Sequence, residues 1–257
     1  MNKNHRTSVL KSSRIKLKQI VEQKGLSDVA VSVLVKPLTA EEAIGKPGRR
    51  DFPIIIGKER VIEAEILGAK GHAYTDSPAD FIGRLAEILN LPLKTNRERA
   101  LYIATLNAVL RHLGLADGTV HCKDEDPELC GKEIASYILK QWGKVRVGLI
   151  GLNPAIAEAL ISAFGVENVK ITDLNKQNIG SAKYGVEIWD GREIPRELIK
   201  QSDVVLITGT TLVNGTFDSI MDCVQNYGKD YLIYGVTTAG ICKLMGMNRI
   251  CPYGRNH

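Results

Sequence analysis

The second half of the chain alternates short, mainly apolar runs with segments of helical periodicity. The apolar runs lie at residues 145–150, 169–172, 204–207 and 231–234, and the helical patterns at 154–164, 195–200, 218–227 and 239–244. Strands that are apolar on both faces are typical of a parallel sheet with helices on either side. Because parallel crossover connections are right-handed, this order predicts an α/β fold with a Rossmann-like, doubly wound parallel sheet.

The first part of the chain has a different rhythm, which predicts a smaller α+β domain over residues 1–94. Residues 9–23 show the apolar stripe of a helix. Strand-like runs follow at 29–35, 52–56 and 61–67, and the last two are expected to pair as a hairpin around residues 57–59. A second helix is expected from Ser77 to Leu89. This order favours an antiparallel sheet.

A helix over residues 96–113 is expected to link this domain to the second one, at residues 95–257, whose core sheet begins at about residue 143. Thr95 and Glu98 form a capping box, and the helix is apolar on nearly every side, which predicts burial between the two domains. Asn107 lies inside it. A buried amide requires a partner, so Asn107 is expected to bind either a backbone carbonyl or a ligand held between the domains.

Composition narrows the classes of partner. The chain has 257 residues and a net charge of +5, with its basic excess mainly in the first sixty residues. Clustered Lys and Arg on a recognisable nucleic-acid motif are missing, so no nucleic-acid partner is expected. No apolar run approaches the ~20 residues needed to span a bilayer. The amino terminus lacks a signal-peptide pattern and the five cysteines are an odd number, which favours free thiols and a cytoplasmic location.

Polar side chains follow each of the four predicted strands. Because the carboxyl ends of parallel strands meet at one edge, these turns are expected to form a binding crevice. The predicted ligand-binding residues are Asn153, Asp173, Asn178, Thr208, Gly209, Thr210, Thr211, Asn214, Thr237 and the interdomain Asn107. Hydroxyls, amides and free backbone N–H groups suit a small polar or anionic molecule.

Structural roles compete with binding at several of these positions. Asn153 before Pro154 suits a helix N-cap as well as an anion site. Asp173 lies about 20 residues after Gly151, where a Rossmann protein places the acid that binds ribose, but aspartate in a loop also bridges local backbone amides. The fingerprint G-x-G-x-x-G is missing, which disfavours a nucleotide cofactor. An enzyme that uses NAD or S-adenosylmethionine remains an alternative.

A second alternative is a metal carrier or sensor without catalysis. His121, Cys122 and Cys130 lie close together in the sequence, and Cys251 lies near the carboxyl end. Thiolate and imidazole are the ligands that soft and borderline metals select. The gap between Cys122 and Cys130 is longer than the close pairs of structural zinc sites, so an acidic surface loop with one buried thiol is the competing interpretation.

The segment 202–216, with Thr208-Gly209-Thr210-Thr211 as its most specific part, resembles the putative heavy-metal chelation domain family. The residues Tyr234 to Gly240 and Cys251-Pro252-Tyr253-Gly254 show the same resemblance. In that family, a Rossmann-like carboxyl-terminal domain follows a small domain similar to the amino-terminal domain of enolases. Residues 39–93, with Asp51-Phe52-Pro53, and the downstream Leu106-Asn107-Ala108 look like that small domain.

The resemblance implies metal handling linked to anaerobic cofactor or corrinoid metabolism. Threonine-rich loops suit an organic ligand better than a bare soft metal, and a metal carried within an organic chelator reconciles the two. We therefore expect a binding protein or enzyme that holds a small molecule, with or without a transition metal, in the crevice between its domains. A homo-oligomer is left open.

Overall fold

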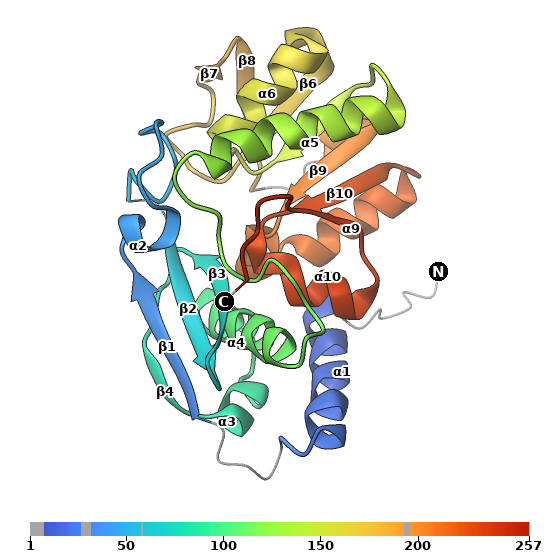
Figure 1. Cartoon of the computed structure of the whole chain (residues 1–257). Helices are drawn as coiled ribbons and strands as arrows, with labels where there is room; N and C mark the ends of the chain where they lie inside the picture. Colours follow the sequence, from blue (N-terminus) through green and yellow to red (C-terminus); the bar gives the residue numbers. More distant parts are fainter. Residues whose placement is uncertain (1–7, 27–31, 58, 193–195, 257) are drawn as a thin grey trace.

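The computed structural model describes residues 8–26, 32–57, 59–192 and 196–256. It has a mixed α/β fold in which two β-sheets lie on either side of a central region of helices (Figure 1). The first helix, α1 (Val9–Gln23), has the predicted bounds, and Ser8 caps it, because the side chain of Ser8 accepts a hydrogen bond from the backbone N–H of Lys11. It packs against α10 (Ala239–Met245), near the other end of the chain.

The first sheet is antiparallel, as predicted, with the order β3-β2-β1-β4. Its strands are β1 (Ser32–Leu38), β2 (Arg60–Ile66), β3 (Ala69–Thr75) and β4 (Phe81–Arg84). The tight turn between β2 and β3 contains Leu67 and Gly68, both with positive φ. Two such residues form the turn that matches the twist of a hairpin.

Three expectations for this region are wrong. Residues 52–56 form turns, because Phe52 and Ile54 are buried in a small cluster with residues such as Ile44 and Val61 and do not pair with a strand. The hairpin therefore joins β2 to β3 and not residues 52–56 to β2. The expected helix at 77–89 is β4, which pairs with β1, followed by the short helix α3 (Leu85–Leu89). Residues 29–31, 58 and 195 of the predicted elements lie outside the described residues.

Helix α4 (Asn96–His112) is buried, as its sequence predicts. The Thr95 and Glu98 capping box is present. The helix contacts β2 and β3 on one side, and α8 (Thr210–Asn214) and α10 on the other. A Cβ atom at Gly71 of β3 would lie 2.4 Å from the backbone oxygen of Ala104 in α4. The lack of a side chain at Gly71 thus lets the first sheet pack directly against this helix.

The second sheet has the order β11-β10-β9-β5-β6-β8-β7, and all its pairings are parallel except that of β7 with β8. Its strands are β5 (Val147–Ile150), β6 (Val169–Asp173), β7 (Ala182–Lys183), β8 (Val186–Asp190), β9 (Val204–Thr208), β10 (Asp230–Tyr234) and β11 (Arg249–Ile250). Leaving out the short β7, the spatial order of the strands is the 3-2-1-4-5-6 order of a Rossmann sheet. The predicted fold class is confirmed. Strand order reverses between β5 and β9.

Helices cover both faces of this sheet, as the apolar strands predict. Leu206 of β9 packs in a cluster with α5 (Asp126–Trp142) and α6 (Pro154–Phe164). Its neighbours Val205 and Ile207 face the opposite way, toward α7 (Arg196–Gln201) and α9 (Phe217–Asn226), in a cluster that also contains α4 and the first sheet. The two sheets therefore share one continuous hydrophobic core.

The remaining elements are the short helix α2 (Ala40–Ile44) after β1 and two 3-10 turns, η1 (Val166–Asn168) and η2 (Val236–Thr238). Helix α5 and strand β8 were not predicted from the sequence. Helix α5 carries Cys130, so only part of the segment around Cys122 is a loop. In the described part of the chain, none of the helices has the length and apolar character needed to cross a bilayer.

Candidate functional site

A cavity of about 700 Å³ lies at the carboxyl edge of the parallel sheet, beneath residues of the first sheet and the loop before it. Strands β5 and β9, between which the strand order reverses, both end at this cavity, which is where open α/β sheets bind ligands. The predicted residues that line it are Asn153, Asp173, Asn178, Thr208, Gly209, Thr210, Thr211, Asn214, Thr237, His121, Cys122, Cys130 and Cys251. The structure thus brings all four predicted junctions together.

The turn after β5 packs closely against the end of β9. Gly151 has a φ of 87°, and a Cβ atom there would lie 2.5 Å from the Cγ2 of Thr208. The hydroxyl of Tyr234, at the end of β10, donates to the carbonyl oxygen of Gly151 at 2.8 Å. Asn153 caps α6 by accepting a hydrogen bond from the N–H of Ile156. The capping role of Asn153 uses its oxygen and leaves its amide nitrogen for other partners.

The acid after β6 is held within its own loop. Asp173 accepts hydrogen bonds from the backbone N–H groups of Leu174 and Asn175 and from the side-chain amide of Asn178 at 2.5 Å. Of the two roles considered for Asp173, the structure shows the bridging of local amides. The carboxylate still faces the cavity, and Asn178 lines it as well.

The threonine-rich turn after β9 forms a short helix, α8. The hydroxyls of Thr208 and Thr210 lie 3.2 Å apart, and the hydroxyl of Thr211 donates to the carbonyl of Thr208. The side-chain oxygen of Asn214 accepts from both the N–H and the hydroxyl of Thr216. These contacts fix the loop and leave unused hydrogen-bonding capacity at the hydroxyls and at the Asn214 amide nitrogen.

Two predicted residues tie the second sheet to the first. The hydroxyl of Thr237 accepts a hydrogen bond from the N–H of Tyr74 in β3. Asn107 donates from its amide nitrogen to the carbonyl of His72 at 2.9 Å and of Val236 at 3.2 Å, and accepts from the N–H of Gly240. Asn107 has no exposed surface and is not among the lining residues. The side chain of Asn107 is therefore hydrogen-bonded to backbone groups, and Asn107 is not part of the proposed binding site.

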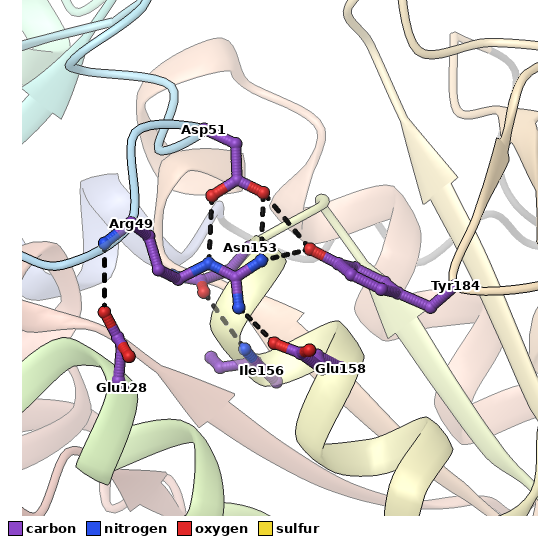
Figure 2. A network of polar contacts seen from close by, with 7 residues as sticks. All are labelled: Arg49, Asp51, Glu128, Asn153, Ile156, Glu158 and Tyr184. Carbon is purple, nitrogen blue, oxygen red and sulfur yellow. Dashed lines mark hydrogen bonds and ion pairs between the residues drawn. The ribbon is translucent and has the colours of Figure 1, made fainter.

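The loop between α2 and β2 forms part of the cavity wall and is fastened by Arg49 (Figure 2). The Arg49 guanidinium binds both oxygens of Asp51, Glu158 of α6 and the hydroxyl of Tyr184, while its backbone N–H donates to Glu128 of α5. The hydrogen bond with Arg49 lowers the pKa of Asp51, so this carboxylate stays ionised. The side chain of Arg49 thus joins the loop to α6 and to the β7–β8 turn of the second sheet, and its backbone joins the loop to α5.

Among the described residues that line the cavity, four are carboxylates, against one lysine, Lys183, and no arginine. Besides Asp51 and Asp173 they are Asp76, which accepts from the side-chain amide of Asn96, and Glu59. Burial, and then the charges of Asp173 and Asp76, raises the pKa of Glu59 to about 7. Neither Glu59 nor Asp76 was among the predicted site residues, because no motif in the sequence connects them with the strand ends. Because the wall is acidic, it favours a neutral or cationic ligand over the anionic one that was expected.

The predicted metal ligands form another part of the wall. The Nδ1 of His121 lies 2.5 Å from the carbonyl oxygen of Cys122, and burial lowers the pKa of His121 to about 4. Burial likewise raises the pKa of Cys130 to about 12 and raises that of Cys122 further. The two thiols are therefore protonated near pH 7, whereas metals bind the thiolate. The imidazole of His121 is neutral, which is the form that metals bind.

Across residues 8–26, 32–57, 59–192 and 196–256, no three His, Cys, Asp or Glu side chains are arranged to hold a metal ion. His121, Cys122, Cys130 and Cys251 share a cavity wall, and a metal centre built from them stays a prediction.

The fold is similar to that of solved structures from the DUF364 family. The crystal structure of a DUF364-family protein of unknown function from Pyrococcus horikoshii superposes with a TM-score of 0.51 and 15% identity, over 90% of this chain and 80% of that chain. Another of unknown function, from Desulfitobacterium hafniense, gives 0.45 and 16% identity, over 72% of each chain. At this identity the first likeness concerns the fold alone. No curated protein matches the sequence.

A profile of the DUF364 family, described as putative heavy-metal chelation, matches residues 135–246, which include the threonine-rich end of β9. The resemblance that this motif carried is thereby confirmed. Residues 135–246 of the chain thus resemble DUF364 proteins, a family described as putative heavy-metal chelation.

Proposed function

We propose that the protein binds a small polar molecule in the cavity between its two sheets. The observation that carries this proposal is the convergence of four polar strand ends and an acidic wall on one cavity. Its volume of about 700 Å³ falls within the range of ~300–1,000 Å³ that small-molecule sites occupy. The site lies at the reversal point of a Rossmann-ordered sheet, where the fold leaves a crevice.

The polar groups of the wall suit an uncharged or positively charged molecule. Thr208, Thr210 and Asn214 supply hydroxyl and amide groups from one side, and Glu59 and Asp76 supply carboxylates from another. Like charges repel, so this wall disfavours the anionic molecule that the sequence suggested. The remaining donors are neutral and orient a ligand without requiring it to carry charge.

A metal would enter this site inside an organic chelator. Burial raises the pKa values of Cys122 and Cys130, so these two thiols are protonated near neutral pH. No group of three ligating side chains among the described residues is arranged to hold a bare ion. An organic ligand supplies its own metal donors and needs from the protein only shape and hydrogen bonds. Metal handling of this kind agrees with the description of the family that residues 135–246 match.

The threonine-rich turn provides the test. Wild-type protein and the double variant T210A/N214A would be purified gently and side by side, and their small molecules extracted by denaturation and compared by mass spectrometry. We expect a compound that accompanies the wild type in near-stoichiometric amount and is depleted at least tenfold in the variant. N226A, which alters an exposed side chain at the end of α9, is the matched control. Equal ligand content in all three proteins contradicts the proposal.

A nucleotide-dependent enzyme is tested in the same preparations. A ligand at 100 times its Kd adds ~2.7 kcal/mol to stability, so NAD, NADH and S-adenosylmethionine at millimolar concentration would raise the melting temperature by several degrees. We expect no such rise, because Asp173 is already held by its own loop and the turn after β5 contains a single glycine.

A further inference from the structure

One carboxylate of the cavity wall differs from the other three. Asp51 is paired with Arg49, Asp76 accepts from Asn96, and Asp173 accepts from two backbone N–H groups and Asn178. The carboxylate of Glu59 has no hydrogen bond or ion pair within the part of the chain that the structure describes. A half-buried carboxylate without a partner is uncommon in a folded protein and requires an explanation.

A second polar group of the same wall also lacks a partner. Thr172, at the end of β6, is 2% exposed and lines the cavity, yet its hydroxyl oxygen has no hydrogen-bond partner among the described residues. A buried hydroxyl left unpaired costs ~1–3 kcal/mol. Two unsatisfied groups on one cavity wall therefore point to a partner from outside the chain.

The charges that surround Glu59 define the chemistry of that partner. Asp173 and Asp76 act on Glu59 from the second sheet and from the end of β3, and both disfavour its ionisation. The nearby phenols of Tyr74 and Tyr234 are neutral, because burial raises the pKa of each well above its usual value. Lys183, the one lysine among the described residues of the wall, is exposed to solvent. Arg60 donates from its guanidinium to the backbone carbonyl of Glu59, not to its carboxylate. Among the described residues, no cationic side chain is paired with the Glu59 carboxylate.

We infer that Glu59 receives a positively charged, hydrogen-bond-donating group of the bound molecule, such as a protonated amine or amidine. The inference rests on the proposed function, since it names the group of that ligand which the acidic wall recognises. Binding of a cation would pair the one free carboxylate and offset the repulsion from Asp76 and Asp173. A charge-assisted hydrogen bond of this kind is about twice as strong as a neutral one.

The cysteines of the wall allow the charge of the cavity to be measured without the ligand. Cys251 is half-buried and lines the cavity, and Tyr74 experiences the charges of both Cys251 and Glu59, which places them around the same phenol. Cys251 would be labelled with two methanethiosulfonates of similar size, one carrying a trimethylammonium group and the other a sulfonate. Each rate would be divided by the rate with a small free thiol, and Cys251 would be identified by peptide mapping.

At pH 8.5 we expect the cationic reagent to label Cys251 at least threefold faster than the anionic one, since an ionised carboxylate in the same cavity attracts one reagent and repels the other. The ratio should fall toward one in E59Q and stay unchanged in E187Q, which alters an exposed carboxylate of β8. In the wild type, but not in E59Q, the ratio should also fall as the pH drops through about 7. The low ionic strength of the buffer would be held constant.

A ratio that is the same in E59Q and in the wild type overturns the inference. The E59A variant, verified as folded by circular dichroism, repeats the test should E59Q fail to fold. The chemistry of a co-purified compound, and its occupancy in E59Q, test the role of Glu59 independently. A co-purified compound without a cationic group, or one that E59Q retains at full occupancy, contradicts the role of Glu59 while leaving the proposed function intact. The absence of any compound counts against the proposed function, and the labelling ratio still decides the role of Glu59.

Discussion

The side-chain oxygen of Asn107, in the buried helix α4, accepts a hydrogen bond of 2.8 Å from the backbone N–H of Gly240 at the start of α10. The amide nitrogen of the same residue donates to the carbonyl of His72 in β3. One side chain thus fastens the first sheet and the Rossmann-ordered half to the helix between them. The cavity wall depends on this junction, because Thr237, which lines the cavity, lies beside it.

Replacing Asn107 by alanine should destabilise the protein. The substitution leaves the carbonyl of His72 and the N–H of Gly240 buried without partners, at a cost of ~1–3 kcal/mol for each group. We therefore expect N107A to lower the free energy of unfolding by about 2–4 kcal/mol in urea titrations. N226A, at an exposed position, should change it by less than ~0.5 kcal/mol. A stable N107A protein would mean that the two halves are held together elsewhere.

Replacing Arg49 by alanine should loosen the loop that closes the cavity. The Arg49 side chain is only 17% exposed and binds Asp51, Glu158 and Tyr184 together (Figure 2). Hydrogen bonds between charged groups contribute ~1.5–3 kcal/mol, so we expect a loss of that order. Hydrogen exchange should become faster in residues 46–57 and remain unchanged in the parallel sheet.

Arg50 provides the matched control for this substitution. It is the exposed neighbour of Arg49 in the same loop, so R50A removes an equal charge without removing the contacts to α6 and the β7–β8 turn. Equal exchange rates in R49A and R50A would show that Arg49 does not hold the loop.

Glu59 should make the stability of the protein depend on pH. Burial and the neighbouring Asp173 and Asp76 raise its pKa from 4.5 to about 7, so the folded chain holds the proton more tightly than the unfolded chain. The wild type should therefore lose stability relative to E59Q as pH rises from about 4.5 to 7, with no further loss above that. One pKa unit corresponds to ~1.36 kcal/mol, so the loss is at most about 3 kcal/mol, and partial exposure reduces it.

Urea titrations of the wild type and E59Q at pH 5 and pH 8 measure this difference. The free energy of unfolding of the wild type, relative to that of E59Q, should be lower at pH 8 than at pH 5. E187Q, altered at an exposed site, should differ from the wild type by the same amount at both pH values. A gap that stays constant between the two pH values would show that Glu59 has an ordinary pKa.

The five cysteines should differ in reactivity according to their burial. Cys122, Cys223 and Cys242 are buried, whereas Cys130 and Cys251 are half-buried. In the folded protein we expect iodoacetamide to modify Cys251 before the buried three, as judged by peptide mass spectrometry. Because the pKa of Cys130 is raised to about 12, its small thiolate fraction at pH 8 should slow its reaction roughly hundredfold or more. Cys122 reacting as fast as Cys251 would contradict the described cavity wall.

The Rossmann-like half could be predicted because its strands are buried on both faces. Their apolar residues form near-continuous runs, and the polar residues begin where the strands end, so the positions of Thr208 and Asn153 at the cavity followed from topology. Strand β8 escaped prediction because Val186 and Ile188 are inward-facing, whereas Glu187 and Asp190 interrupt the apolar run.

The first sheet was harder to predict because tertiary contacts override its local pattern. Strand β3 contains Gly71 and His72, since it packs directly on α4, and it therefore lacks the alternation of a typical strand. Residues 52–56 are apolar because they pack against α2 and the cavity, although they form turns. Glu59 lies far from the second sheet in sequence, and only the folded chain shows that its carboxylate faces the strand ends.

The electron density of crystals grown from gently purified protein tests the central claim most directly. We predict density for one small molecule in the cavity, in contact with Thr210 or Asn214 on one side and with Glu59 on the other. A molecule bound at another surface, or a cavity filled by residues 46–57, would contradict the account.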